Sequence, residues 1–270
     1  MKGGLFLRIL SIETRKNMSY RADFWIDALA SFVVEITVAY FLWQAIFAES
    51  GREIIGGFGF EGMVFYYVMV LLTGKIVRGD ARKAEIARDI YEGTLTRYLV
   101  LPGSYVAFKY AERLGNLFPA LVQVLGFGGL AAWLLDVRAV GTITPGSTAR
   151  AAAALVVGSL TAFLMSYLIE SVAFWADNVW SLNVMLRFVA GLAGGQLLPL
   201  ALFPGWAQTL VELLPFRFLF SFPVLTLIGR IEPAEWLLGM GVGLFWIGAL
   251  YLAASLAWRR GYEAYTGVGI

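Results

Sequence analysis

The sequence contains no cysteine and no histidine among its 270 residues. Without cysteine, the chain has neither disulfide bonds nor thiol chemistry. Without histidine, it lacks the side chain that most often serves as a general base, a metal ligand or a pH switch near neutrality. These two absences exclude thiol enzymes and most metal-dependent enzymes, and they leave carboxylates as the main acid–base groups.

Charged residues are also scarce, at 15% of the chain, against about 25% in an average soluble domain. Hydrophobic residues make up 59% of the sequence, and the net charge of +2 is too small to indicate a nucleic-acid partner. A helix that crosses the hydrocarbon of a bilayer needs ~20 mostly apolar residues, and several segments reach that length. We therefore predict an all-α, polytopic protein of the lipid bilayer.

The motifs of nucleotide binding and serine hydrolysis are missing as well. The sequence has no G-x-x-x-x-G-K-[ST] phosphate-binding loop and no G-x-S-x-G nucleophile motif. The segment GGFGFEG (56–62) is rich in glycine but has no lysine. We therefore expect that this chain binds no ATP, metal or other cofactor and is not an enzyme.

Six segments are predicted to span the membrane, and no internal repeat or flexible linker divides them. Residues 1–270 are therefore predicted to form a single transmembrane domain. Before the first span, residues 3–20 have Leu5, Ile9 and Ile12 on one helical face, which favours a helix in the membrane interface over a disordered basic leader. The predicted spans cover residues 24–48, 62–79, 114–135, 150–175, 184–203 and 235–258.

Lysine and arginine are divided unevenly between the two sides of these spans. With the N-terminus inside, 16 of the 21 basic residues lie on the inner side and five on the outer side. Basic residues concentrate in cytoplasmic loops. Both termini and the loop at residues 80–104 are therefore predicted to be cytoplasmic, in a multi-pass protein of the cytoplasmic (inner) membrane.

Residues 204–230 are long enough to form another span but have an unsuitable composition. They contain three prolines, and Glu212 and Arg217 lie near their middle. Proline interrupts helix hydrogen bonding, and charges are costly in lipid. We predict a broken outer hairpin, in which two short helices enter from the outer side and are covered by protein.

The loop between the second and third spans contains DIYEGTLTRYLVLP (89–102). A helix over residues 80–92 is expected to continue the second span into the cytoplasm, and Gly93 then permits a sharp turn. Thr94 is a candidate N-cap of a short helix that Pro102 ends. Such a helix suits docking into a groove of a partner, although a loop that only covers lipid headgroups is the alternative. Its exposed side chains are expected to be Leu95, Tyr98, Leu99 and Leu101.

This stretch, followed by YVAFKYAERLG (105–115), resembles the permeases of ABC-2-type transporters. It is most similar to the subgroup whose membrane subunits are separately encoded and paired. The N-terminal interfacial helix, six spans, cytoplasmic termini and broken outer hairpin are also similar, so the resemblance covers nearly the whole chain. It implies a cytoplasmic coupling helix that docks into a cleft of a separate ATPase subunit, and that subunit would hold ATP and Mg.

The resemblance also implies a second permease subunit, which is this chain or, preferably, a related paralogue. Leu95 and its apolar neighbours would contact the ATPase, and Gly93 would set the turn. The residues assigned to ATPase coupling are Asp89, Glu92, Gly93, Thr94, Leu95, Arg97, Tyr98, Leu99 and Pro102.

Four charged residues are predicted to lie within or near the membrane interior. Glu35 is surrounded by valines in the first span and needs a partner, water or a proton. It either lines a transport path or, as we prefer, forms an ion pair that locks two helices. Lys75 lies at a comparable depth, and Arg187 is another candidate partner. Glu170, near the inner end of the fourth span, is expected to snorkel or to pair locally.

The leading hypothesis is thus an export-type ABC permease that works by alternating access and is driven by a partner ATPase. An ion-coupled secondary transporter using Glu35 is the alternative, but such proteins usually show inverted repeats. A membrane-embedded enzyme and an assembly scaffold are weaker alternatives. The substrate class stays open among lipids, lipid-linked glycans, hydrophobic drugs and peptides.

Overall fold

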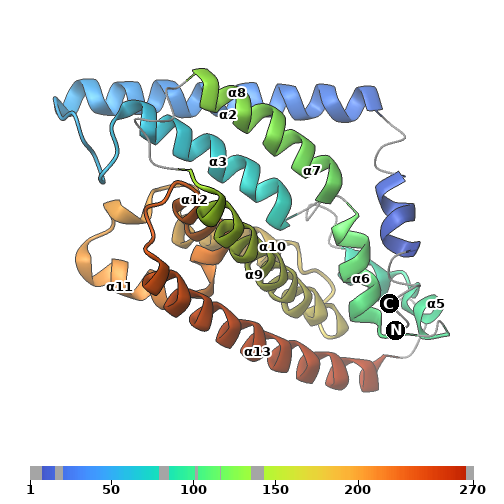
Figure 1. Cartoon of the computed structure of the whole chain (residues 1–270). Coiled ribbons are helices and arrows are strands. Elements are labelled where there is room, and N and C mark those ends of the chain that lie inside the picture. The colour runs from blue at the N-terminus through green and yellow to red at the C-terminus, as the bar shows by residue number, and fades with distance from the viewer. Residues whose placement is uncertain are drawn as a thin grey trace.

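The computed structural model describes residues 8–15, 21–78, 85–100, 103–115, 117–134 and 143–265, and within these ranges it contains no β-strand. Figure 1 shows α2 and α13 on opposite sides of the molecule, with α3, α9, α10 and α12 between them. The elements are a helix over residues 8–15, α2 (Arg21–Ser50), α3 (Phe60–Arg78), α4 (Glu85–Tyr91), α5 (Leu95–Leu99), α6 (Tyr105–Leu114), α7 (Leu117–Gln123), the π-helical turn η2 (Val124–Gly128), α8 (Gly129–Leu134), α9 (Pro145–Glu170), η4 (Ser171–Phe174), α10 (Trp180–Ala193), η5 (Leu200–Leu202), α11 (Gly205–Leu213), η6 (Pro215–Leu219), α12 (Ser221–Leu227) and α13 (Pro233–Ala264).

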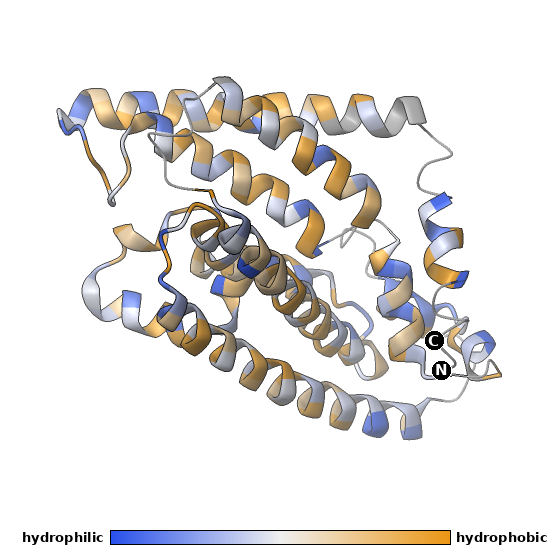
Figure 2. Cartoon of the chain, viewed as in Figure 1, coloured by the Kyte–Doolittle hydropathy of each residue, from blue (hydrophilic) through white to orange (hydrophobic). Residues whose placement is uncertain are grey.

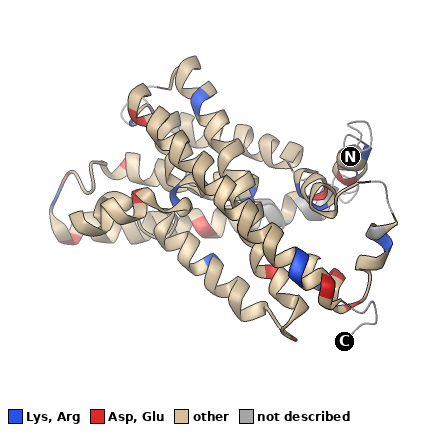
Figure 3. Ribbon diagram, turned by 90° about the horizontal axis from the view of Figure 1, so that it is seen from below, with Lys and Arg blue, Asp and Glu red and all other residues tan. Residues whose placement is uncertain are grey.

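Five helical stretches are long and apolar enough to cross a membrane, and this confirms the predicted all-α polytopic fold. The hydropathy colouring in Figure 2 shows apolar residues along most of the length of these helices. Figure 3 shows long stretches of helix without charged residues. The five stretches are Leu29–Ser50, Phe60–Arg78, Tyr105–Trp133, Pro145–Phe174 and Pro233–Ala264.

The predicted fifth span, 184–203, is wrong in its limits. The helix that forms there, α10, has 14 residues and ends at Ala193, so it is about 21 Å long in a hydrocarbon layer of ~30 Å. It ends because Gly195 has a positive φ of 86°, a conformation that glycine adopts without strain. The apolar residues that follow fold into turns and a short 3₁₀ helix.

The third and sixth spans also differ from their predicted limits. The third apolar stretch begins at Tyr105, directly after the predicted cytoplasmic loop at 80–104, and not at residue 114. The sixth helix continues to Ala264, several residues beyond the predicted end at 258. In both cases the helix extends past the apolar run, because amphipathic residues at its end pack against other elements.

The predicted broken hairpin at 204–230 consists of α11, η6 and α12. The side chains of Phe218, Phe220 and Phe222 are at most 1% exposed, so protein covers η6 and α12 as expected. The first helix, α11, is not covered in this way, because Trp206 is 73% exposed and Leu210 is 56% exposed. A Cβ atom added at Gly158 of α9 would overlap the carbonyl oxygen of Phe218, which shows that the hairpin lies directly against the α9 backbone. Its placement on the outer side of the membrane stays a prediction.

The helices differ greatly in how far the rest of the chain covers them. In α3, 78% of the most apolar window is buried, whereas the figure is 17% for both α2 and α13. Helix α3 therefore forms the centre of the bundle. Helices α2 and α13 present apolar side chains outward.

The N-terminal part of the chain contains a helix over residues 8–15, within the predicted interfacial helix at 3–20. It lies close to the end of α6, because a Cβ atom added at Gly115 would overlap Glu13. The rest of the predicted helix lies outside the described residues. Its position at a membrane surface and the single-domain organisation of residues 1–270 both stay predictions.

Candidate functional site

The predicted coupling segment folds as a helix, a turn and a second helix, which we call the α4–α5 unit (residues 85–100). Gly93 has a positive φ of 70° in the turn, which confirms that a glycine is required where the chain changes direction. The first helix, α4, begins at Glu85. The predicted continuity of this helix with the second span concerns residues 79–84, which lie outside the described residues.

Thr94 precedes α5 but does not cap it as predicted. Its backbone has helical angles, φ −73° and ψ −11°, and its side chain accepts no hydrogen bond from the helix. A capping residue needs a non-helical backbone that directs its oxygen to the next turn. The Thr94 hydroxyl instead donates to Asp89 Oδ1 at 2.9 Å, so this side chain ties the turn back to α4.

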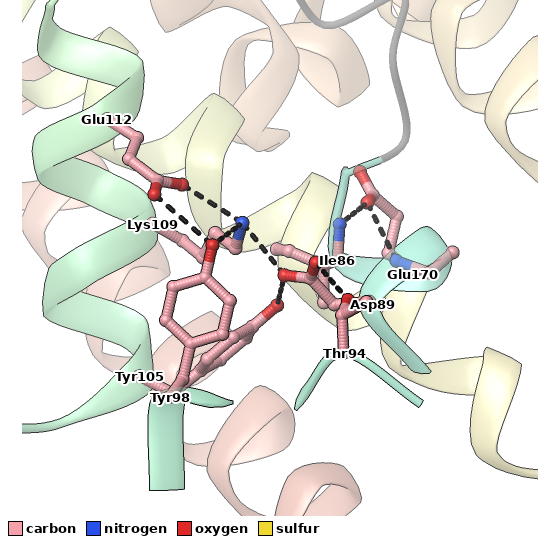
Figure 4. A network of polar contacts seen from close by, with 9 residues as sticks. Ile86, Asp89, Thr94, Tyr98, Tyr105, Lys109, Glu112 and Glu170 are labelled. Atoms are coloured by element: carbon pink, nitrogen blue, oxygen red, sulfur yellow. Dashed lines mark hydrogen bonds and ion pairs between the residues drawn. The ribbon is translucent and has the colours of Figure 1, made fainter. Parts of the chain in front are cut away.

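Asp89 is the centre of a buried polar network that joins α4, α5 and α6 (Figure 4). Its Oδ1 accepts the hydrogen bond from Thr94, and its Oδ2 accepts one from the Tyr105 hydroxyl at 2.7 Å. The same Oδ2 lies 2.8 Å from Lys109 Nζ. This carboxylate is only 14% exposed, and both of its oxygens have hydrogen-bond donors.

Lys109 supplies the positive charge of the network. Its side chain is 6% exposed, and Nζ lies 2.8 Å from Asp89 and 2.9 Å from Glu112 Oε2. The ammonium also donates to the Tyr98 hydroxyl at 3.1 Å and lies 4.7 Å from the centre of the Tyr98 ring. A buried ammonium between two carboxylates is fully paired, so α5 is fixed to α6 through Tyr98.

Tyr98 of α5 acts in this network as a neutral hydroxyl. Partial burial raises its pKa above the ordinary value, against the opposing effect of Lys109. It therefore keeps its proton at neutral pH and donates to Glu112 Oε1 at 3.4 Å. Its ring packs edge-on against Tyr105, with 5.2 Å between the ring centres.

Leu95 was predicted to be exposed and to contact the ATPase, and this is wrong. The side chain is 0% exposed and belongs to an apolar cluster with Ile86, Ile90 and Phe163. The cluster also contains residues of α6, α9 and α13, which the sequence of α5 does not reveal. Leu95 therefore anchors the unit from inside.

The exposed surface of the α4–α5 unit is formed by other residues. Val100 is 83% exposed, while Tyr98 is half-buried. The predicted coupling residue Pro102, the predicted exposed residue Leu101 and the side chain of Leu99 lie outside what the structure describes. The outward-facing residues of the unit are Glu85, Arg88, Glu92, Thr96, Arg97 and Val100.

Glu170 was predicted to snorkel or to pair locally, and the structure shows neither. It is 6% exposed at the end of α9, and its Oε2 accepts hydrogen bonds from the backbone N–H groups of Ile86 at 2.9 Å and Ala87 at 3.3 Å. The first N–H groups of a helix have no partner within the helix. A carboxylate 84 residues away in sequence thus fixes the start of α4 to the bundle.

The network continues into the bundle through stacked aromatic rings. Tyr105 stacks on Trp258 of α13, with ring centres 4.7 Å apart. Trp258 also stacks on Tyr167 of α9 at 5.2 Å and meets the ring of Phe174 edge-on at 5.1 Å. The α4–α5 unit is therefore connected to α6, α9 and α13 by rigid side chains.

The structure separates the remaining predicted intramembrane charges. Glu35 lies on the exposed face of α2 and forms no hydrogen bond or ion pair with any residue in the described part of the chain. The ion pair that we expected within the chain is therefore not formed. Lys75 lies half-buried in the last turn of α3. Arg187 is half-buried in α10 and likewise has no ion pair within the described ranges.

Sequence reasoning missed three residues of the network, namely Tyr105, Lys109 and Glu112. The segment that contains them was noted only for its resemblance to known permeases. One signal was present, because Lys109 and Glu112 have the i, i+3 spacing of a helical ion pair. Their contact with Asp89 depends on the turn at Gly93, which no local pattern predicts.

Residues 33–269 match the family model described as ABC-2 family transporter protein. The chain belongs to the ABC-2 family. This match covers most of the sequence, including the α4–α5 unit, so the chain is a multi-pass membrane protein of a transporter family. No curated protein and no solved structure shows significant similarity to it.

Proposed function

We propose that this ABC-2 family protein is the permease subunit of an ABC transporter and that a separate ATPase docks on the α4–α5 unit. The observation behind this proposal is that a five-residue helix, α5, is held rigidly in place. An isolated helix of that length is unstable in water. Here the buried Asp89–Lys109–Glu112 network and the buried Leu95 fix it from beneath.

The exposed side of the unit has the mixed character of a docking surface. It presents the apolar side chain of Val100 beside Arg97 and Thr96, and Arg88 pairs with Glu92 at 2.7 Å. A short helix with apolar and polar groups suits a groove on a partner protein. The excess of basic residues in the adjoining loops supports a cytoplasmic position, where ATP and Mg are available to the partner.

In this proposal the chain itself binds and hydrolyses no ATP. It works beside a second permease subunit in the cytoplasmic membrane and moves its substrate outward by alternating access. The direction rests on the resemblance to paired ABC-2 permeases. The apolar surfaces of α2 and α13 suit a substrate that enters from the bilayer, such as a lipid, a lipid-linked glycan or a hydrophobic compound.

Co-purification with nucleotide-binding proteins of the native membrane tests the docking site. The variants Arg97→Glu and Val100→Asp change only exposed side chains, so the bundle should fold normally. We expect each variant to lose most of the ATPase that accompanies the unaltered chain. The matched controls are Arg52→Glu and Ile54→Asp, which make the same changes at exposed positions in the loop between α2 and α3.

Retention of the ATPase by both α5 variants would contradict docking at this unit. If the folded, unaltered chain transports substrate without any ATPase, the permease proposal fails and an ion-coupled transporter takes its place.

A further inference from the structure

Arg78, at the predicted inner end of the bundle, points inward instead of toward water. It is the last residue of α3, yet its guanidinium turns back along the helix, because a Cβ atom added at Gly74 would lie 3.2 Å from Nη2. The guanidinium lies 4.9 Å from the centre of the Phe220 ring, and Nη2 donates to Gln196 Oε1 at 2.9 Å. Long basic side chains at the end of a membrane helix usually extend to the aqueous side, so Arg78 is placed in an unusual way.

Arg113 approaches the same region from α6. Its Nη2 donates to the carbonyl oxygen of Val77, the neighbour of Arg78, at 3.0 Å, and its guanidinium lies 5.8 Å from the centre of the Phe163 ring. The two arginines are close enough to repel each other electrostatically. The fold therefore brings positive charges from α3 and α6 together inside an apolar bundle, and each charge lies over an aromatic ring.

The charge of Arg113 is poorly compensated within the described part of the chain. A guanidinium carries several N–H donors, but the Arg113 side chain has one acceptor there, Val77, and its Nε is buried without a partner. Glu170 attracts Arg113 from a distance, but Glu170 Oε2 already accepts two backbone hydrogen bonds from α4. Glu112 is paired with Lys109. An uncompensated buried charge is costly, so an anion beside Arg113 would be stabilising.

Arg217 of η6 shows how a similar arginine is balanced elsewhere in the bundle. Its Nε is also buried without a partner among the described residues, and its guanidinium lies 5.2 Å and 4.9 Å from the ring centres of Phe218 and Phe222. Two carboxylates, those of Glu212 and Glu235, attract it. Arg113, in contrast, is acted on by one carboxylate and by a second arginine. The region around Arg78 and Arg113 therefore has the greater need for negative charge.

We propose that Arg78 and Arg113 together bind the phosphate group of an anionic membrane lipid. The planar fork of arginine matches phosphate oxygens, and basic sites between membrane helices on the cytoplasmic side bind lipid headgroups. The neighbouring rings of Phe163 and Phe220 favour a phosphate that is attached to acyl chains. A phosphate between the guanidinium groups would offset their repulsion and join α3 to α6. This inference goes beyond the permease function proposed above and can be measured without the ATPase.

Lipid titration of the purified, delipidated chain in detergent tests this site. The probes are phosphatidylglycerol, which has a net negative charge, phosphatidylcholine, whose choline cancels the charge of its phosphate, and inorganic phosphate, which has no acyl chains. Native mass spectrometry counts the lipids bound to each chain, and thermal unfolding followed by tryptophan fluorescence measures the stabilisation. We expect one tightly bound phosphatidylglycerol per chain, and weaker binding of phosphatidylcholine and of inorganic phosphate.

The variants Arg113→Gln and Arg78→Gln should each weaken phosphatidylglycerol binding at least about tenfold, because each removes a charge-assisted contact. The matched control is Arg217→Gln, which removes another half-buried arginine and should keep the affinity of the unaltered chain. Stability without lipid separates binding from a structural role. Arg113→Gln removes an uncompensated charge, so its unfolding temperature in lipid-free detergent should be unchanged or higher, while the gain on adding phosphatidylglycerol should be lost.

Several results would overturn the inference. Equal affinity for phosphatidylglycerol and phosphatidylcholine would exclude a role of the charge, and equally tight binding of inorganic phosphate would exclude a lipid as the ligand. A lower lipid-free stability of Arg113→Gln with unchanged lipid affinity would show that Arg113 only ties α6 to Val77. If Arg78→Gln folds poorly because Gln196 loses its donor, Arg113→Gln decides the question. No ATPase is present in these samples, so failure of docking at the α4–α5 unit leaves each of these results unaffected.

Discussion

Replacing Lys109 by methionine is the most direct test of how the α4–α5 unit is held. The substitution keeps the length of the side chain but removes the only positive charge from between Asp89 and Glu112. Breaking a buried ion pair by removing one partner costs ~3–5 kcal/mol. Asp89 keeps its hydrogen bonds from Thr94 and Tyr105, and Glu112 is 22% exposed, so water can reach it.

We therefore expect the unit to be destabilised by about 2–3 kcal/mol, at or below the lower end of that range. This corresponds to a roughly 30- to 150-fold increase in the population of the detached unit. Hydrogen exchange of the amides at residues 85–100, measured in nanodiscs, should accelerate by a similar factor. The exchange of α9 and α13 should change little, because their own packing remains.

The control is Arg88→Met, which removes an ion pair of similar length, 2.7 Å, from the exposed side of α4. Exposed ion pairs contribute little to stability, so its exchange pattern should match the unaltered chain. A second variant, Lys109→Met with Glu112→Gln, should recover part of the protection because it removes one of the two unpaired charges. If Lys109→Met leaves the exchange of residues 85–100 unchanged, the network does not hold the unit and the reasoning above is refuted.

Two further substitutions test the contacts that position the unit and the hairpin. Glu170→Ala leaves the N–H groups of Ile86 and Ala87 without a partner, at a cost of ~1–3 kcal/mol for each. Exchange at residues 85–91 should accelerate, whereas Glu170→Gln, whose amide oxygen still accepts, should retain most of the protection. A Cβ atom at Gly243 would lie 2.7 Å from Val157 Cγ1, whereas one at Gly241 meets nothing within 4 Å. Gly243→Ala should therefore lower the thermal stability in detergent by ~1–3 kcal/mol, and equal behaviour of Gly241→Ala would contradict this packing.

The sequence predicted the number and type of the main helices well because hydrophobic length is a local property. Each long apolar run needs only its own composition to be recognised. The limits of α10 could not be predicted in the same way. Residues 194–203 are as apolar as the helix before them, and the helix ends through the backbone conformation at Gly195 and its hydrogen bond to Tyr66.

The candidate site was predicted in outline but not in its orientation. The turn at Gly93 was readable because glycine marks a change of direction. Leu95 was taken as exposed because a five-residue helix gives no evidence of which face is covered. Its burial depends on Phe163 and on the end of α13, which lie far away in sequence. Asp89 and Lys109 meet for the same reason, since the turn places two helices side by side.

The same contacts determine which parts of the bundle must move together. Tyr105 donates to Asp89 at 2.7 Å and stacks on Trp258 at 4.7 Å, so α4 and α13 share one side chain. Sliding α4 past α6 would separate Lys109 from Asp89, which is costlier than shifting an apolar helix across lipid. A force applied to the α4–α5 unit should therefore displace α6 and the adjoining ends of α9 and α13 as one body.

By contrast, α2 is joined to the bundle mainly by apolar and ring contacts, such as the stacking of Phe32 on Phe127 at 4.6 Å. Apolar surfaces have no directional bonds to break when they slide. Few directional contacts among the described residues therefore hold α2 in one position against the bundle. Movement of the α4–α5 unit should therefore shift α6 and the adjoining ends of α9 and α13 relative to α2.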